Sequence, residues 1–147
     1  MKWVTRERPK TDRVACPWLI RKFVDPRAEF LYVAQDRVLD IAREVGGRSF
    51  DAPGADYTHR GDLCTFEVLI DEFELHAEPG LAPLASIVHG ADVSGAPDPH
   101  PASAGLLAIA EGLLRVEAND QEVRLIGARV YDALYAWCQA HDEPRSP

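Results

Sequence analysis

The first 51 residues alternate between two hydrophobic patterns, and this alternation most constrains the fold. Short runs bounded by turn residues indicate strands, and the segments between them have helical spacing. In chain order the expected elements are a strand at Lys2–Thr5, a helix from an N-cap at Thr11 to about Phe23, a strand at Glu29–Val33, a helix at Arg37–Val45 and a strand at Ser49–Asp51. Pro17 lies inside the first helix and should kink it or shift its start. Strands that alternate with helices predict a small sheet, mostly parallel or mixed.

From Leu63 onward the apolar residues recur at helical spacing only. The expected helices are about Asp62–Phe73, Ala82–His89, Ala102–Val116 and Asp120–His141. Ser94–Pro101 contains three prolines and a glycine, and is expected to be a surface loop. The predicted fold class is therefore α/β (α+β-like), with a small N-terminal sheet and a predominantly helical C-terminal half.

Chain length and cysteine content limit the classes of protein to which this chain can belong. A chain of 147 residues with 46% hydrophobic residues is expected to form one globular domain, here residues 1–141, followed by a frayed tail at 142–147. Three widely separated cysteines without a CxxC motif argue against a disulfide framework and for a reducing compartment. The sequence has neither a signal-peptide pattern nor an apolar run near 18 residues, so we expect a cytoplasmic protein without a membrane span.

The charge is unevenly distributed. The formal net charge is −8, which disfavours direct binding to nucleic acid. Eight basic residues nevertheless lie within the first 27 positions: Lys2, Arg6, Arg8, Lys10, Arg13, Arg21, Lys22 and Arg27. We predict that Arg6, Lys10 and Arg13 bind a small anionic substrate, together with amides at a helix N-terminus. The alternative is a solvated basic face that pairs with the acidic remainder of the chain.

Two segments each carry a histidine and a carboxylate at positions expected to face inward. His59 precedes Glu67, which helical spacing places along the edge of an apolar stripe, and His89 lies three residues before Asp92. Two imidazoles with one or two carboxylates suit Zn²⁺, Mn²⁺ or Fe²⁺ and leave a position open for water or substrate. We predict that His59, Glu67, His89 and Asp92 bind the metal. Either Glu67 or Asp92 could also act as a catalytic base.

Each of these residues has a simpler interpretation. His59 could cap a turn, Glu67 could pair with an arginine such as Arg13 or Arg60, and His89 could be a cation at a helix C-terminus. Cys64, a further catalytic candidate, lies three residues before Glu67 near an expected helix start. The helix dipole there would lower the pKa of its thiol, making it a redox-sensitive thiolate or a soft metal ligand. The alternative for Cys64 is packed core, which is also our prediction for Cys16 and Cys138.

Five segments resemble the chromate-resistance domain family, the C-terminal domain of ChrB-type proteins. They are Lys2–Arg6, Asp12–Phe23, Thr58–Glu67, His89–Asp92 and Val130–Cys138, so the resemblance extends from residue 2 to about residue 140. It implies a relation to chromate-responsive regulators in which this domain is joined to an N-terminal portion. Because the chain begins directly at the domain, we expect a standalone copy, without any DNA-binding role that belongs to the N-terminal portion.

Three functions are considered from the sequence. The first is a metal-binding protein or metal-dependent enzyme that acts with Mn, Fe or Zn in oxyanion or redox-stress response. The second is a non-enzymatic sensor, in which the basic residues hold chromate or sulfate and a cysteine reports oxidation. The third is a structural domain that docks on another protein. The expected partners are a small anion and, as an open alternative, a second copy of the chain.

Overall fold

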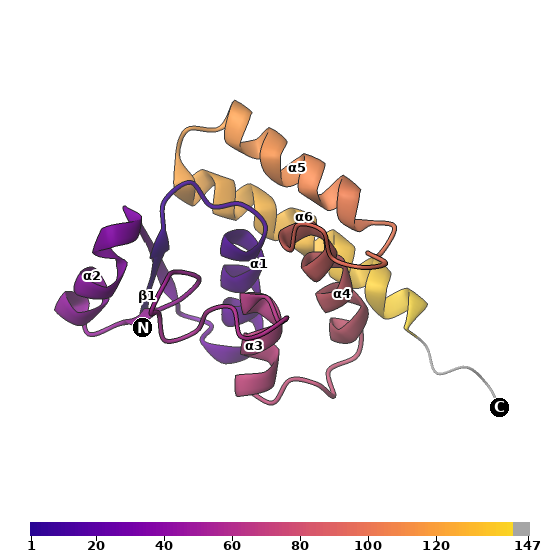
Figure 1. Cartoon of the computed structure of the whole chain (residues 1–147), viewed down its shortest axis with the longest axis horizontal. Coiled ribbons are helices and arrows are strands. Elements are labelled where there is room, and N and C mark those ends of the chain that lie inside the picture. The colour runs from indigo at the N-terminus through magenta and orange to yellow at the C-terminus, as the bar shows by residue number, and fades with distance from the viewer. Residues whose placement is uncertain (143–147) are drawn as a thin grey trace.

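Three short parallel strands form the sheet, in the order β2-β1-β3. The sheet lies beside the helical part of the chain (Figure 1). The strands are β1 (Lys2–Arg6), β2 (Glu29–Val33) and β3 (Arg48–Ser49). All three predicted strands are confirmed, although β3 is short, and Phe50 beyond it forms only an isolated bridge with Tyr57. The structure is a computed structural model that describes residues 1–142. The expected frayed tail, apart from Asp142, therefore lies outside the described residues.

The two faces of the sheet are covered by different helices. The 3₁₀ turn η2 (Gln35–Arg37) leads into α2 (Val38–Val45), which packs against β1. Because side chains alternate along a strand, Val4 joins a small core with Ala42 of α2, whereas Trp3 faces the main core. Both side chains are almost fully buried. The sheet is thus covered on both faces, as expected for parallel strands.

The first long helix contains a proline. It begins as α1 (Asp12–Leu19) and continues as the π-helix η1 (Ile20–Val24). Its start agrees with the predicted position, although Thr11 makes no side-chain capping hydrogen bond. Pro17 lies inside α1, where it lacks an N–H group and its ring crowds the carbonyl four residues earlier. Three residues after Pro17 the helix changes to the wider π form, so the proline does not shift the start.

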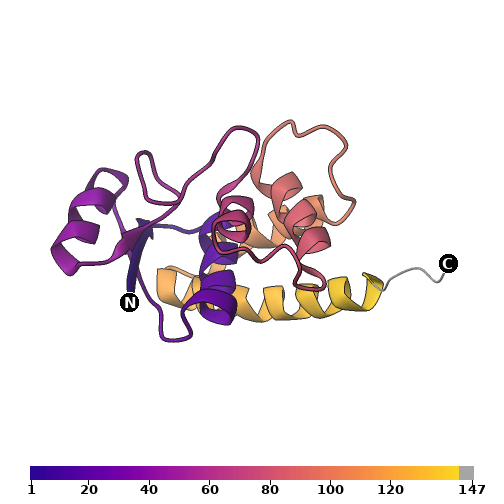
Figure 2. The same ribbon diagram turned by 90° about the horizontal axis from the view of Figure 1, so that it is seen from below.

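The rest of the chain is helical, as predicted. The helices are α3 (Thr65–Glu72), α4 (Leu81–Asp92), α5 (Ser103–Val116) and α6 (Asp120–His141). α6 is the longest helix and contacts α1, α4 and α5. Figure 2 shows it running along one side of the helical part, with the loops that follow β3 on the opposite side. Within residues 1–142, no helix combines the length and the apolarity that crossing a bilayer requires.

Two helix boundaries differ from the prediction by three residues, for tertiary reasons. α3 begins at Thr65 because Arg60 and Leu63 bridge across a turn in which Gly61 has a φ of 58°. α4 continues to Asp92, and Gly90 does not end it. A Cβ at Gly90 would lie 2.4 Å from Oγ of Ser103, so the missing side chain lets α5 approach α4.

We therefore expect Gly90→Ala to lower the free energy of unfolding by about 1–3 kcal/mol, the usual cost of overpacking a close contact. Ser103 cannot easily move away, because its hydroxyl donates a hydrogen bond to the carbonyl of Ile87 at 2.8 Å. Urea unfolding followed by circular dichroism measures the change. The matched control is Gly112→Ala on α5, where a Cβ meets nothing within 4 Å. The control should be neutral or stabilising. Equal effects of the two substitutions would contradict the packing argument.

Candidate functional site

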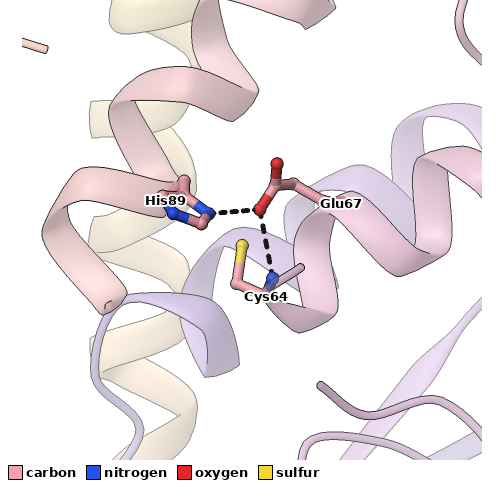
Figure 3. A group of neighbouring side chains, drawn as sticks. All are labelled: Cys64, Glu67 and His89. Atoms are coloured by element: carbon pink, nitrogen blue, oxygen red, sulfur yellow. Dashed lines mark hydrogen bonds and ion pairs between the residues drawn. The ribbon is translucent and has the colours of Figure 1, made fainter. Parts of the chain in front are cut away.

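The four predicted metal ligands lie in two separate clusters. His59 and Asp92 meet Asp12 and Asp51, a group that we call the carboxylate cluster. Glu67 and His89 meet Cys64, a group that we call the thiol cluster (Figure 3). The sequence segments instead group His59 with Glu67 and His89 with Asp92. The structure pairs them the other way round, because the segment between β3 and α3 brings His59 to Asp51.

One imidazole lies at the centre of the carboxylate cluster. Nε2 of His59 lies 3.1 Å from an oxygen of Asp92, 3.4 Å from one of Asp12 and 3.5 Å from one of Asp51. The side chain of Asp12 is fully buried, whereas that of His59 is 46% exposed. The cluster is thus a buried group of carboxylates that reaches solvent on the side of His59.

Asp12 also caps α3. Its carboxylate accepts hydrogen bonds from the backbone amides of Thr65 at 2.8 Å and Phe66 at 3.3 Å. These are the first residues of α3, whose amides have no partner within the helix. The hydroxyl of Thr65 donates to Asp51 at 2.8 Å, so both carboxylates are fixed by the same helix end. Asp12 was not predicted as a site residue, because its contacts with α3 join positions distant in the sequence.

Asp51 was also missed, although it follows the third strand. Side chains just beyond the carboxyl ends of parallel strands often form ligand sites, and this topological signal could have identified it. Arg6 donates from Nε to the carbonyl of Asp51 at 2.8 Å, and its NH2 group lies 3.4 Å from the carboxylate. Arg13 lies 3.5 Å from the same carboxylate. Two of the three predicted anion-binding residues therefore border the carboxylate cluster.

The third residue of that prediction lies elsewhere. Nζ of Lys10 is 3.9 Å from a carboxylate oxygen of Glu111 on α5. The alternative interpretation, in which the basic residues pair with acidic ones, therefore accounts for the contacts of all three side chains. Binding of an anion by Arg6, Lys10 and Arg13 stays a prediction.

The carboxylate cluster shifts the pKa values of its members. Hydrogen bonds to Asp12 and Asp51 raise the pKa of His59 to about 10. Burial raises the pKa of Asp12 to about 7. Burial and the negative charge of Asp51 also raise the pKa of Asp92. The pKa of Asp51 is lowered, because hydrogen bonds from His59 and Thr65 outweigh the effect of burial. The imidazole of His59 is therefore a cation at neutral pH, held among carboxylates.

The thiol cluster forms where α3 begins beside α4. Cys64 is the N-cap residue of α3, and its backbone amide donates to Oε1 of Glu67 at 3.1 Å. The same oxygen lies 2.5 Å from Nδ1 of His89, so one carboxylate oxygen contacts both partners (Figure 3). Glu67 does not pair with Arg13 or Arg60. Arg60 instead pairs with Asp71 and Glu72.

The structure corrects the expectation of a thiolate at Cys64. Its side chain is fully buried, and burial raises the pKa of the thiol despite the nearby helix end. The free thiol is therefore protonated at neutral pH and is not a reactive nucleophile. Cys16 and Cys138 are buried in the main core, as predicted.

A cavity of about 480 Å³ opens beside the thiol cluster. Glu67 and His89 form part of its lining, together with Leu81 and Ala85 of α4 and His100 from the loop before α5. Its volume lies within the range of small-molecule sites. The two clusters are thus different chemically: one is built of carboxylates around an imidazole, and the other places a thiol, a carboxylate and an imidazole beside a cavity.

Comparisons with known proteins agree with the resemblance described from the sequence. The family described as "ChrB, C-terminal domain" matches residues 3–138. Protein ChrB of Cupriavidus metallidurans (strain CH34) is 39% identical over 133 residues, which make up 90% of this chain. The match covers 39% of that relative, so the chain spans about two fifths of its length. No solved structure matches the chain.

Proposed function

Because the chain belongs to the ChrB C-terminal domain family, we propose that it acts in chromate resistance by binding a divalent cation at the carboxylate cluster. The ligands would be Asp12, His59 and Asp92, with Asp51 beside them. The observation that carries this proposal is the convergence of carboxylate oxygens on Nε2 of His59. The cation would be Mn²⁺, Fe²⁺ or Zn²⁺, which accept imidazole and carboxylate ligands.

The spacing of the ligand atoms supports a metal site. Atoms that bind one cation at about 2.0–2.2 Å lie about 2.8–3.6 Å from one another in octahedral or tetrahedral geometry. The distances of 3.1 Å and 3.4 Å from His59 to Asp92 and Asp12 fall in this range. His59 is half-exposed, so the site is open to solvent on that side.

A cation at this cluster would take the place of a proton. Asp51 is paired with Arg6 and Arg13, and all three carboxylates of the cluster face the imidazole of His59. A divalent cation would replace the proton on His59 and leave Nε2 free to bind it. Arg6 is one-third exposed beside Asp51, which supports a small oxyanion as the ligand class on the open side. A bound cation could activate a water molecule, or change redox state in the case of Fe or Mn.

Metal analysis tests this proposal directly. We expect untagged wild-type protein to contain near-stoichiometric Mn, Fe or Zn by inductively coupled plasma mass spectrometry, and His59→Ala to lose it. Each cation is also added back to the purified protein and the excess removed. The matched control is His76→Ala, because His76 is an exposed histidine that contacts Asp71 and neither cluster. It should retain the metal.

The same analysis distinguishes the two clusters and the alternative function. Retention of the metal by His89→Ala would assign it to the carboxylate cluster. Absence of every metal from wild type, even after each cation is added back, would overturn the proposal. The oxyanion-sensor hypothesis would then be tested by thermal stabilisation with chromate or sulfate.

A further inference from the structure

We propose that Cys64, Glu67 and His89 form a second metal centre, for a thiophilic divalent cation such as Zn²⁺ or Co²⁺. Figure 3 shows the three side chains converging from the start of α3 and from α4. One sulfur, one oxygen and one nitrogen atom of these residues lie within 4.8 Å of one another. The thiol cluster shares no residue with the carboxylate cluster, so this centre is independent of the function proposed above.

The present contacts are close to those of a metal site. Zinc lies about 2.3 Å from a thiolate and about 2.0–2.2 Å from nitrogen or oxygen, so its ligands are about 3.3–3.7 Å apart. Oε1 of Glu67 and Nδ1 of His89 are 2.5 Å apart, a separation typical of two atoms that share a proton. A cation that replaced this proton would require the carboxylate and the ring to separate by about 1 Å, which side-chain rotation allows.

The charges of the donor set match a divalent cation. A thiolate and a carboxylate contribute two negative charges and the imidazole none, so the complex is neutral in a partly buried place. On binding, the thiol of Cys64 loses its proton to solvent, and the neutral ring of His89 carries its proton on Nε2. No oxidant or other co-reactant is needed. A metal deprotonates a coordinated thiol outright, so the burial of Cys64 does not prevent binding.

The cavity gives this centre a function different from that of the carboxylate cluster. Three protein ligands leave the fourth position of a tetrahedral cation open, as in catalytic zinc sites. Here Glu67 and His89 also line the cavity of about 480 Å³. Asp71 and Asp98 lie in its wall, and no Lys or Arg of the described chain does. The lining therefore offers an oxyanion such as chromate no ammonium or guanidinium group, while Asp71 is itself paired with Arg60 and His76.

Cobalt titration tests the centre, because a thiolate bound to Co²⁺ gives a charge-transfer absorption band that oxygen and nitrogen ligands do not. The protein is kept reduced with a non-thiol reductant under anaerobic conditions. We expect the band in wild type and its displacement by Zn²⁺. Cys64→Ser should lose the band. Glu67→Gln, which has nearly the same shape, should weaken Co²⁺ binding at least about tenfold.

Two controls keep the result interpretable. Cys138→Ser changes a buried cysteine outside the thiol cluster and should retain the band, and circular dichroism confirms that each variant is folded. His59→Ala should also retain the thiolate band. A failure of the carboxylate cluster to bind metal would therefore not affect this test. No thiolate band in wild type at excess Co²⁺ would overturn the proposal. So would a band that persists in Cys64→Ser.

Discussion

Replacing Asp12 with alanine is expected to lower the free energy of unfolding by about 3 kcal/mol and to abolish metal binding at the carboxylate cluster. The carboxylate is fully buried and accepts hydrogen bonds from the amides of Thr65 and Phe66. Without it, two buried donors at the start of α3 lose their partner, at about 1–3 kcal/mol each. Burial of the charge, which raises the pKa of Asp12 to about 7, offsets part of this loss.

Urea unfolding at pH 8, where Asp12 is mostly ionised, measures the effect. For a chain of this size the melting temperature should fall by roughly 10 °C. Asp92→Asn is the matched variant, because it removes one negative charge from the same cluster without touching the amides of α3. The pKa of Asp92 is raised by burial and by Asp51, so the folded state disfavours its ionised form. Replacing this carboxylate with a neutral amide should lower the free energy of unfolding by less than about 1 kcal/mol, or should raise it. Similar losses in both variants would contradict a capping role for Asp12.

Much of the fold could be predicted because its signals are local. The run Glu29–Val33 is bounded by turn residues and forms β2 with the predicted limits. Asp120–His141 also forms a helix with the predicted limits, since the side chain of Asn119 caps it by accepting from the amide of Glu122. The boundaries that differ depend on contacts distant in sequence. The sequence predicts that the helix ends just before Gly90. In the structure Gly90 is an interior residue of α4, where it lies against Ser103 of α5.

The site could be predicted only in part. Helical spacing correctly placed Glu67 in a partly buried position, with its side chain 22% exposed. Asp92, whose side chain is 17% exposed, is partly buried because α4 continues past the predicted end at His89. Helical spacing could not determine which imidazole each carboxylate meets, because that depends on the path of the loop between β3 and α3. Asp12 lies 47 residues before His59 in the chain, and no local pattern joins them. Its role as a cap for α3 is purely tertiary.

The affinity of the carboxylate cluster for Mn²⁺ is expected to rise about tenfold per pH unit between pH 7 and pH 9. Hydrogen bonds to Asp12 and Asp51 raise the pKa of His59 to about 10, so its imidazole is protonated throughout this range. Nε2 must lose that proton before it can bind a cation. Each unit of pH below 10 therefore weakens binding by one factor of ten. Below pH 7 the dependence should steepen, because burial raises the pKa of Asp12 to about 7 and a second proton must leave.

Competition between the protein and a chelator of known affinity, under anaerobic conditions, measures this slope. His89→Ala should retain it, because His89 belongs to the thiol cluster, whereas His59→Ala should bind weakly at every pH. If wild type bound Mn²⁺ with the same affinity at pH 7 and pH 9, the cation would not displace a proton from His59. The imidazole would then be the permanent positive partner of the three carboxylates, and the cluster would be an ion-pair network that fixes the start of α3.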